Sequence, residues 1–564
     1  MKKKLLSPAK ILCLLMLLIT TQIAFGQSMP DYLRTKVDSL FMKWDNPNSP
    51  GCVVGIIRND SLLYSKGFGL ANLENDIPNT PRSIYYMCSL AKQFTGYAIV
   101  LLAREGKLSF DDDIRRYLPW MADFGHKITI RNLLNHTSGI RDEGDLAEIA
   151  GIPADGMLTQ AYALDVLKRQ HTLNFIPGEK YSYSNSNYIL LAEIVKIASG
   201  QSFPEFVANA IFKPLAMQNS HIVANYTDLI KARAASYLNS GGKYENDFQN
   251  TYVLGAGSLF SNMDDMARWV MNFYSPKAGD LKDIEQLTER GKLNNGKIIN
   301  YAFGIAVDSS QGWKRLSHIG SLAGYRTEIV VYPDLKTGFL VFGNSGNNEI
   351  YSKVDQLAAL FIPDIGKHKV AQLLTQKDSA AAFLKDTSLV HSFAGDYLAE
   401  DGNQRKFSII NGRFWVNKRT LLIPETATTF YLPGNRAAKF TFHGTGNKEI
   451  SADFINPGLT APVHFVKLTK GLQLPDEELQ TYAGNYYCPE LDCHYHIVLK
   501  EHQLWFTNSL HPDAKITLMG RNDLLSSYDP FFYHSKILRS PEREIVGFEL
   551  NSDEMMHLKF NKIQ

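Results

Sequence analysis

The segment from Phe94 to Glu105 constrains the fold of this chain more than any other feature. It is almost entirely apolar, and Gly106 follows it as a helix C-cap. A helix that is apolar on all sides must be covered by other elements, so it belongs in the interior of a large domain. The 564 residues are enough for two or three domains.

A serine and a lysine stand three residues apart where this helix begins. Residues three apart on a helix share a face, so the Lys92 amine can reach the Ser89 hydroxyl and take or steer its proton. Unpaired amides and the helix dipole favour developing negative charge at such a position. The spacing alone does not identify a site, because two other pairs share it: Ser7/Lys10 and Ser240/Lys243.

The net charge of the chain and its first 26 residues indicate which partners it can bind and where in the cell it is found. The formal net charge of +2, with no long basic run after the first residues, argues against nucleic acid as a partner. Four lysines in the first ten residues precede an apolar run from Ile11 to Ile19, and small residues end at Gly26. This pattern predicts a signal peptide over residues 1–26 and export across the inner membrane to the periplasm. The alternative, a retained membrane anchor, is less favoured because the run is short for a span, and no later segment is long enough.

Export would remove Cys13 and leave four cysteines: Cys52, Cys88, Cys488 and Cys493. Cys488 and Cys493 flank a four-residue turn and can pair in an oxidising compartment. His494 and His496 next to Cys493 also allow a metal site, although histidines that alternate with a tyrosine are typical of a surface strand. Cys88 is interpreted as a small buried thiol, and its position beside Ser89 makes oxidation sensitivity an alternative.

The order of elements over the first 360 residues predicts an α+β domain. An apolar stretch from Gly51 to Ile57 and the residues after Asn59-Asp60 form a hairpin. Helices follow, including residues 188–199 with Gly200 as cap. Three more strands are expected at residues 314–319, 326–332 and 338–342, and then a closing helix at 354–361. These strands would complete one antiparallel sheet flanked by helices.

The last 180 residues contain an internal duplication of short alternating strands. Three pairs of segments match in order: Phe393-Ala394-Gly395-Asp396-Tyr397 with Tyr482-Ala483-Gly484-Asn485-Tyr486, Phe414-Trp415-Val416 with Leu504-Trp505-Phe506, and His464–Leu468 with His557–Phe560. Each unit is predicted to form a small antiparallel barrel or half-barrel. The predicted boundaries are 27–366 for the α+β domain, 367–385 for a linker, and 386–470 and 471–564 for the two β-rich repeats.

A serine nucleophile also needs a proton acceptor and groups that place the substrate. Tyr183 supplies a phenol that can act as a base beside Lys92, and Asn185 can donate to a substrate carbonyl. The same spacing recurs at two other places, Tyr237/Asn239 and Tyr244/Asn246. Tyr183 is favoured because it follows Pro177-Gly178 and precedes a buried helix that would hold it rigid.

Two segments compete for a third element, His318-Ile319-Gly320 and Lys336-Thr337-Gly338. The lysine version matches a known Lys-Thr-Gly motif. However, residues 326–332 form a strand of roughly 20 Å at about 3.3 Å per residue, which puts the two segments at opposite sheet edges. The histidine version is favoured because a loop at Gly324-Tyr325 follows it and can line a pocket.

Taken in order, these stretches resemble the serine β-lactamase and penicillin-binding protein superfamily. The similarity is to its branch of class C β-lactamases, D-alanyl-D-alanine carboxypeptidases and related esterases, and it covers roughly Gly51 to Phe361. It rests on these segments: Pro50-Gly51, Ser89-Leu90-Ala91-Lys92, Leu134-Asn135-His136-Thr137-Ser138-Gly139, Pro177-Gly178, Tyr183-Ser184-Asn185, Gly255-Ala256-Gly257 and His318-Ile319-Gly320.

The resemblance implies a β-lactamase/transpeptidase-like fold with an all-helical insert, and it implies roles for single residues. Ser89 would be the acylated nucleophile, with Lys92 and Tyr183 as proton-transfer partners. Asn185 and His318 would position the substrate beside Gly320, and the backbone amides of Ser89 and Ser321 would form the oxyanion hole. The resemblance implies no metal and no cofactor.

One departure from the family pattern bears on the activity. The lysine of the third element is His318 here, and a histidine is mostly neutral near pH 7. This weakens the case for efficient β-lactam hydrolysis and leaves amide or ester hydrolysis of a small molecule, a D-amino peptide or a cell-wall peptide. The prediction is a secreted serine hydrolase that acts through a Ser89 acyl-enzyme. The alternatives are a β-lactamase with true turnover, or a catalytically idle protein that binds through its C-terminal repeats.

Overall fold

The computed structural model describes residues 29–563, except 153–155, 311, 363–387, 400–403, 418–419, 433–434, 445–448, 457–461, 469–470, 509–511, 529–530 and 553–554. The predicted signal peptide and the predicted linker therefore lie outside the described residues, and the domain boundaries stay predictions. Among the described residues, no helix is both long and apolar enough to cross a bilayer.

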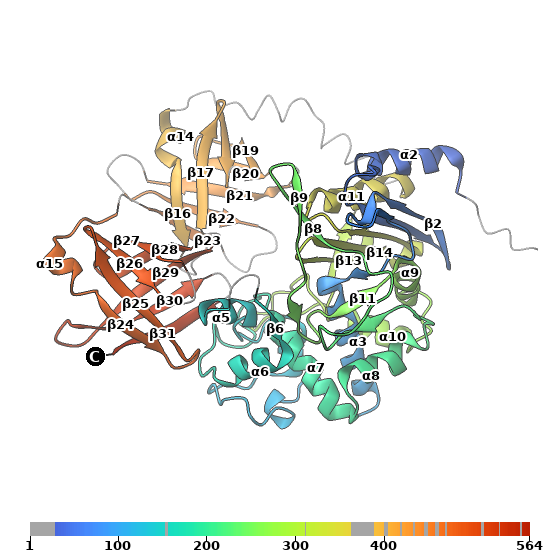
Figure 1. Cartoon of the computed structure of the whole chain (residues 1–564), viewed down its shortest axis with the longest axis horizontal. Helices are drawn as coiled ribbons and strands as arrows, with labels where there is room; N and C mark the ends of the chain where they lie inside the picture. Colours follow the sequence, from blue (N-terminus) through green and yellow to red (C-terminus); the bar gives the residue numbers. More distant parts are fainter. Residues whose placement is uncertain are drawn as a thin grey trace, which may run out of the picture.

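One six-stranded antiparallel sheet organises the N-terminal domain, which is residues 29–362 (Figure 1). Its order is β12-β13-β14-β15-β1-β2. The bounds are β1 Cys52–Arg58, β2 Ser61–Phe68, β12 Ala306–Ser310, β13 Trp313–Leu322, β14 Tyr325–Tyr332 and β15 Thr337–Gly343. The hairpin and the three later strands are confirmed in a single sheet. The edge strand β12 was not predicted, because its sequence Ala-Val-Asp-Ser-Ser lacks a run of strand-forming residues and it forms by pairing with β13.

Helices cover both faces of this sheet. Along β1, Val54 and Ile56 pack with helices α2 (Asp31–Phe41) and α11 (Glu349–Phe361). Val53 and Ile57 point the other way, into the larger core that contains α3 (Ala91–Arg104) and α9 (Met263–Asn272). The alternation along the strand thus divides the apolar residues between two layers of helices.

The apolar helix predicted at the centre of the fold is α3. Every residue from Ala91 to Leu102 is buried, and Gly106 follows with a left-handed φ of +70°. Phe94 stacks on Trp269 of α9 at 4.4 Å between ring centroids. Ser89 lies in a separate 3₁₀ turn, η2 (Cys88–Leu90), directly before α3. The serine therefore stands at the start of a helix whose first twelve residues are all buried.

The remaining elements of the N-terminal domain are mainly helical. Helix α7 (Asn185–Ser199) begins three residues earlier than predicted and ends at Gly200, whose φ is +73°. The other helices and turns are α4 Ile130–Leu134, α5 Glu143–Ile149, α6 Gln160–Lys168, α8 Phe203–Val207, α10 Leu281–Leu287, η1 Met42–Trp44, η3 Ile114–Arg116, η4 Ala208–Phe212 and η5 Pro333–Leu335. The short strands of this domain are β3 Leu70–Asn72, β4 Ile77–Pro78 and β5 Tyr85–Tyr86 before α3, and β6 Leu158–Thr159, β7 His221–Ile222, β8 Tyr237–Ser240, β9 Lys243–Asn246, β10 Thr251–Tyr252 and β11 Leu259–Ser261 between the later helices.

The C-terminal region forms two closed antiparallel barrels, drawn from orange to red in Figure 1. Barrel 1 follows helix α14 (Ser388–Phe393) and consists of β16 Gly395–Ala399, β17 Gln404–Ile410, β18 Arg413–Val416, β19 Thr420–Pro424, β20 Thr429–Leu432, β21 Asn435–His443, β22 Ser451–Ile455 and β23 Val463–Lys467. Barrel 2 follows helix α15 (Asp476–Leu479) and consists of β24 Gly484–Cys488, β25 Cys493–Lys500, β26 Gln503–Thr507, β27 Ala514–Leu518, β28 Asp523–Tyr528, β29 Phe531–Arg539, β30 Ile545–Ser552 and β31 Met555–Ile563. The predicted barrel-like repeats are confirmed as full barrels.

The duplication extends to the first strand of each barrel. Tyr397 donates to the carbonyl of Phe393 at 2.9 Å, and Tyr486 donates to that of Tyr482 at 2.7 Å. Gly395 and Gly484 have φ values of +147° and +151°, and each faces a lysine of the last strand, Lys467 and Lys562 respectively. The equivalence of these two lysines shifts the third predicted sequence match by two residues, because His464 then corresponds to Lys559 rather than His557.

The two cysteines of barrel 2 lie opposite each other at the end of the β24–β25 hairpin. Both are buried free thiols, so this structure contains the predicted proximity without a disulfide. No group of three or more His, Cys, Asp or Glu side chains that could hold a metal occurs among the residues with described positions. His496 instead bonds to Asn485 at 2.6 Å, as on an ordinary strand surface.

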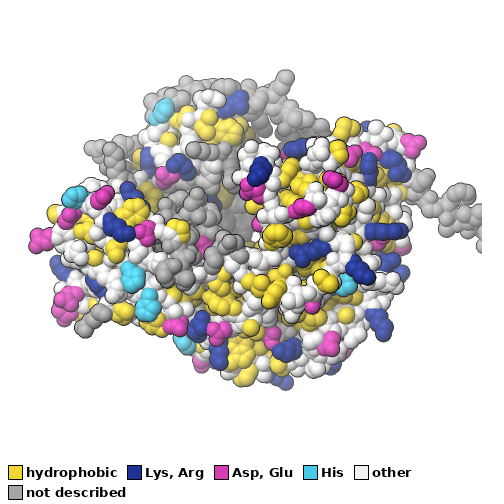
Figure 2. Space-filling view, in the orientation of Figure 1, with side chains coloured by type: hydrophobic (Ala, Val, Ile, Leu, Met, Phe, Trp, Pro, Cys, Tyr) yellow, Lys and Arg dark blue, Asp and Glu magenta, His cyan; other side chains and the backbone are white. Residues whose placement is uncertain are grey.

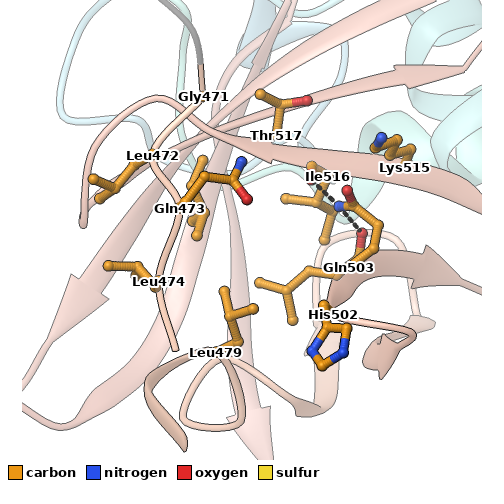
Figure 3. Close-up of a pocket in the computed structure, with 12 residues that line it drawn as sticks. Gly471, Leu472, Gln473, Leu474, Leu479, His502, Gln503, Lys515, Ile516 and Thr517 are labelled. Atoms are coloured by element: carbon orange, nitrogen blue, oxygen red, sulfur yellow. Dashed lines mark hydrogen bonds between the residues drawn. The ribbon is translucent and has the colours of Figure 1, made fainter. Parts of the chain in front are cut away.

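Barrel 2 also has a small cavity of about 140 Å³ where residues 471–474 run past β26 and β27 (Figure 3). The side-chain amide of Gln503 donates to the carbonyl groups of Leu504 and Ile516, as the dashed lines show. Half of the lining residues are leucine or isoleucine, and the side-chain amide of Gln503 is already bonded. Figure 2 shows acidic and basic side chains interspersed on the visible face of the molecule, in keeping with the small net charge.

Candidate active site

The turn that carries Ser89 is held in an unusual backbone conformation. Cys88, immediately before it, has a left-handed φ of +51° although it is not glycine. Such a residue costs of the order of 1–3 kcal/mol and persists only where the surroundings fix it. Here the Met87 amide donates to Leu259 at 2.8 Å, and the Thr327 hydroxyl donates to the Met87 carbonyl at 3.0 Å. The Cys88 thiol is buried, and burial raises its pKa well above the usual range.

Lys92 lies one turn into α3 and is completely buried. Its Nζ is 3.3 Å from the Oγ of Ser89, 2.7 Å from the Oδ1 of Asn185 and 2.9 Å from the carbonyl oxygen of Ala256. An ammonium group has three N–H donors, whereas a neutral amine has two donors and one lone pair. Both forms can keep the contacts to Asn185 and Ala256, so one proton can pass between Lys92 and Ser89 without other rearrangement.

Asn185 is oriented by a carboxyl group that the sequence did not single out. The Oδ2 of Asp142 accepts from the backbone amide of Asn185 at 2.6 Å and from its side-chain Nδ2 at 3.2 Å. Because both donors of Asn185 point to Asp142, its Oδ1 is turned toward Lys92. Burial raises the pKa of Asp142, although the hydrogen bonds from Asn185 and Gly144 lower it.

Tyr183 lies against Lys92, with Nζ 4.9 Å from the centre of its ring. The ring of His136 also packs against Tyr183, at 4.3 Å between ring centres. The Nδ1 of His136 accepts from the Ser184 amide at 3.2 Å and lies 3.1 Å from the Nδ2 of Asn187, which places the ring proton on Nε2. Burial lowers the pKa of His136 well below its usual value, so the supporting ring is neutral.

His318 lies near Tyr183, with 6.5 Å between the ring centres. Its Nδ1 is 2.7 Å from the carbonyl of Ile319, and its Nε2 is 3.0 Å from the hydroxyl of Tyr301. Burial, together with the charge of Lys92, lowers the pKa of His318 to about 4. The histidine is therefore neutral at pH 7, and a direct bond from its Nε2 to a substrate requires displacement of the Tyr301 hydroxyl.

Gly320 and Ser321 bring strand β13 to the edge of the Ser89 turn. A Cβ atom on Gly320 would lie 2.7 Å from the Met87 carbonyl and 2.9 Å from the Cβ of Cys88, so only glycine allows this approach. Strand β12 pairs with β13 only as far as Ser317, which leaves the residues after it to face the turn. Ser321 follows on this edge and is exposed to solvent. The structure thus brings all seven predicted site residues to one place.

The competing motifs lie elsewhere. Thr337 pairs with Tyr332, at the opposite end of β14 from Arg326, which pairs with Ser321. Lys336-Thr337-Gly338 is therefore at the far edge of the sheet, as the strand length predicted. The Ser240 pair and the two alternative tyrosine motifs belong to the β8–β9 hairpin, where Ser240 is exposed.

Three residues of this site were missed in the sequence: Asp142, Tyr301 and the supporting ring of His136. His136 lies in one of the segments that resemble the family, so that motif could have indicated that the residue belongs to the site. Asp142 and Tyr301 stand in loops with no periodicity, and only the folded chain brings them to Asn185 and His318.

A cavity of about 470 Å³ lies near two backbone segments of the site, although none of the seven predicted site residues lines it. It is lined by the aromatic side chains of Tyr226, Phe248, Tyr252 and Tyr325 and by polar and charged residues that include Arg233 and Asp247. Tyr252 is four residues before Ala256, whose carbonyl accepts from Lys92. Tyr325 pairs with Leu322, one residue beyond Ser321. The walls of the cavity therefore continue from the two backbone segments that border Ser89 and Lys92.

Comparisons with known proteins agree with this geometry. The sequence model of the family described as Beta-lactamase matches residues 38–361. The chain is 28% identical over 417 residues to penicillin-binding protein 4* of Bacillus subtilis, covering 70% of this chain and 90% of that protein. It is 28% identical over 320 residues to a D-aminopeptidase of Gluconobacter oxydans, but this match spans 56% of the chain and only 59% of the relative. The solved structure of an octameric penicillin-binding protein homologue from Pyrococcus abyssi is 22% identical and covers 78% of this chain and 99% of that one, with a TM-score of 0.54, a likeness of fold.

Proposed function

This chain belongs to the beta-lactamase family of serine hydrolases, and we propose that it hydrolyses amide or ester bonds of D-amino peptides or related small substrates through an acyl-enzyme on Ser89. One observation carries the proposal: the completely buried Lys92 amine bridges Ser89, Asn185 and Ala256 at 2.7 to 3.3 Å. A buried, fully bonded lysine directed at a half-exposed serine is an arrangement for activating a nucleophile.

In the proposed first half-reaction, the Ser89 oxygen attacks the substrate carbonyl while its proton passes to Lys92, with Tyr183 as the second proton-transfer group. The backbone amides of Ser89 and Ser321 would stabilise the oxyanion. The proton then goes to the leaving amine or alcohol, which departs and leaves an ester on Ser89. In the second half-reaction, the same groups would take a proton from water, which attacks this ester and releases the acid.

The neutral state of His318 supports peptide or ester substrates over β-lactam turnover. A lysine at this position would offer a fixed positive charge to a substrate carboxylate, whereas His318 is uncharged above about pH 4 and already bonds Tyr301. The nearby cavity supports an aromatic or apolar side chain that also carries a polar group, since its lining combines four aromatic side chains with polar and charged ones such as Arg233 and Asp247. D-aminopeptidase activity in one relative favours D-amino amides within this class. Export to the periplasm remains part of the proposal and rests on residues 1–26.

The test is acylation by a fluorescent penicillin or fluorophosphonate probe, followed by hydrolysis of D-amino amides, D-alanyl-D-alanine peptides, short esters and nitrocefin. We expect labelling that Ser89→Ala abolishes and that Ser240→Ala, an exposed match to the same spacing, leaves intact. Labelling that persists in Ser89→Ala would refute the nucleophile. Steady turnover of nitrocefin, rather than a single acylation, would favour the β-lactamase alternative. No turnover of any substrate would favour the idle binding protein.

A further inference from the structure

Arg141 is a charged residue buried between the N-terminal domain and barrel 2. It is 1% exposed, and all five of its N–H groups have acceptors. From the N-terminal domain it contacts Gln170 at 2.7 Å and the hydroxyl of Thr172. From barrel 2 it contacts the Glu490 carboxylate at 2.7 Å and two backbone carbonyl groups, those of Met556 at 2.8 Å and His557 at 3.0 Å. Most of the surroundings of this guanidinium therefore come from a different domain.

Glu490 is built to receive Arg141. It stands in the turn between β24 and β25, whose ends are fixed by the opposed Cys488 and Cys493. Besides Arg141, its carboxylate accepts from the backbone amide of His171 at 3.0 Å, and its carbonyl accepts from the side chain of Gln170 at 3.3 Å. A buried ion pair of this kind does not tolerate loss of one partner, because the other charge is then left without compensation.

Apolar and backbone contacts extend the same interface. The Met556 amide donates to Asn174 at 2.7 Å, and the Tyr495 hydroxyl donates to the carbonyl of Ile149, the last residue of α5, at 3.0 Å. Buried side chains of barrel 2 belong to the same hydrophobic cluster as the core of the N-terminal domain. Figure 1 shows β31 beside α5.

Arg141 is joined directly to the active site by its own backbone and by the next residue. Its carbonyl accepts from the hydroxyl of Ser186 at 2.7 Å. Asp142, the next residue, accepts both N–H groups of Asn185 and so turns the Asn185 carbonyl toward Lys92. A continuous path of bonded groups therefore leads from Glu490 through Arg141 and Asp142 to Lys92.

We propose that barrel 2 is a structural part of the active site, in which Glu490 holds Arg141 and thereby fixes Asp142 and Asn185 in the position that activates Lys92. Glu490, Arg141 and Asp142 are positioning residues, since none of them is proposed to contact substrate. The inference rests on the proposed function for its kinetic readout, and barrel 2 would act on catalysis without entering the substrate pocket.

The first experiment compares Glu490→Ala with Asp513→Ala in the full chain. Asp513 pairs with Lys500 at 2.7 Å on the exposed surface of the same barrel. Asp513→Ala therefore removes one negative charge, as Glu490→Ala does, but leaves the interface with the N-terminal domain unchanged. We expect Glu490→Ala to lower the rate of Ser89 acylation and kcat by about 10- to 100-fold with KM changed less than threefold, because small misplacement of a catalytic group has effects of this size. Asp513→Ala should stay within twofold of wild type. Glu490→Gln keeps a hydrogen-bond acceptor for Arg141, so its activity should lie between those of Glu490→Ala and wild type. If Glu490→Ala does not fold, Glu490→Gln takes its place in the comparison.

A double-mutant cycle with Asp142→Asn separates this role from general stability. If the two residues act through one path, the double variant loses less than the product of the two single losses. Hydrogen exchange should also be faster in residues 183–190 of Glu490→Ala than in wild type. Wild-type kinetics in Glu490→Ala, multiplicative losses in the cycle, or unchanged exchange at residues 183–190 would each overturn the inference. If wild type itself is not acylated, the proposed function fails, and the exchange measurement still decides the inference.

Discussion

Barrels 1 and 2 begin on the same pattern, in which a tyrosine of the first strand bonds back to the residue four earlier and a glycine makes room for a lysine of the last strand. Their buried side chains nevertheless belong to different cores. Those of barrel 1 form a cluster of their own, whereas those of barrel 2 are continuous with the core of the N-terminal domain.

The difference shows that two copies of one fold can make different contacts with the rest of the chain. What attaches barrel 2 is a small set of residues that the barrel fold does not need, chiefly Glu490 in a hairpin turn and the start of β31. Barrel 1 shares the strand order and the capping pattern, but it is organised around its own aromatic cluster. We therefore expect changes that disturb the fold or the interface of barrel 2 to reach the active site, and matched changes in barrel 1 not to do so.

The largest effect should come from removing the Lys92 amine, which contacts Ser89 in the active site. Lys92→Met is expected to lower the acylation rate by about 10²- to 10⁴-fold, the usual size for loss of a proton-transfer group. Lys467→Met is the control, because this lysine also contacts a backbone carbonyl but lies in barrel 1. Its acylation rate should equal that of wild type. Comparable losses in the two variants would contradict the assignment of chemistry to the N-terminal domain alone.

Acid should destabilise the N-terminal domain through the buried His318. The folded-state pKa of His318 is about 4 and its unfolded value is 6.5, so the unfolded chain binds more protons between these limits. The free energy of unfolding therefore falls as pH drops through this window. From pH 8 to pH 4.5 this contribution is roughly 2 to 3 kcal/mol.

Urea unfolding of wild type and His318→Gln at pH 8 and pH 4.5 measures this effect. The variant should gain stability relative to wild type on acidification by the stated amount. His464→Gln provides the control in barrel 1. His464 bonds Asp453 at 2.6 Å, and its hydrogen bond helps lower the pKa of that carboxyl against the effect of burial, so stability linked to Asp453 is lost only below about pH 4. The same pH dependence in wild type and His318→Gln would show that His318 is not held neutral by burial.

The smallest effect should come from the paired glycines, which compare the two barrels directly. Gly395→Ala and Gly484→Ala each place a side chain at a φ near +150°, at a cost of about 1–3 kcal/mol. The new Cβ would lie 2.6 Å from the Cε of Lys467 or Lys562, which can move aside. Both variants should lose similar stability in thermal unfolding, but only Gly484→Ala should lower hydrolysis. Equal activities of the two variants would remove the distinction between the barrels.

Much of the fold could be predicted because its signals are local. The apolar run of α3, the alternation in β1 and β14 and the turn between β1 and β2 each lie within a dozen residues, and burial follows from that pattern. Elements without a local signal could not be predicted. Strand β12 has no strong sequence pattern, and it forms because its backbone pairs with β13.

The site shows the same division. Ser89, Lys92, Tyr183 and Asn185 belong to short segments whose spacing has a chemical meaning, and His318 could be preferred over Lys336 from strand length alone. Asp142 and Tyr301 could not be found in this way, because single polar residues in loops are common and their partners are 43 and 17 residues away. The effect of Tyr301 on His318, which occupies the ring nitrogen expected to face substrate, follows only from the contact itself.

The sequence by itself determined the buried helix with Ser89 at its start, the antiparallel sheet, the duplication and the residues able to carry serine chemistry, since each depends on neighbours along the chain. The tertiary structure decided that Asp142 orients Asn185 and that, within the part of the chain that the structure describes, it is barrel 2 that bonds to Arg141 beside it. Arg141 and Glu490 are 349 residues apart, and a buried ion pair depends on where two surfaces meet, which no local pattern specifies.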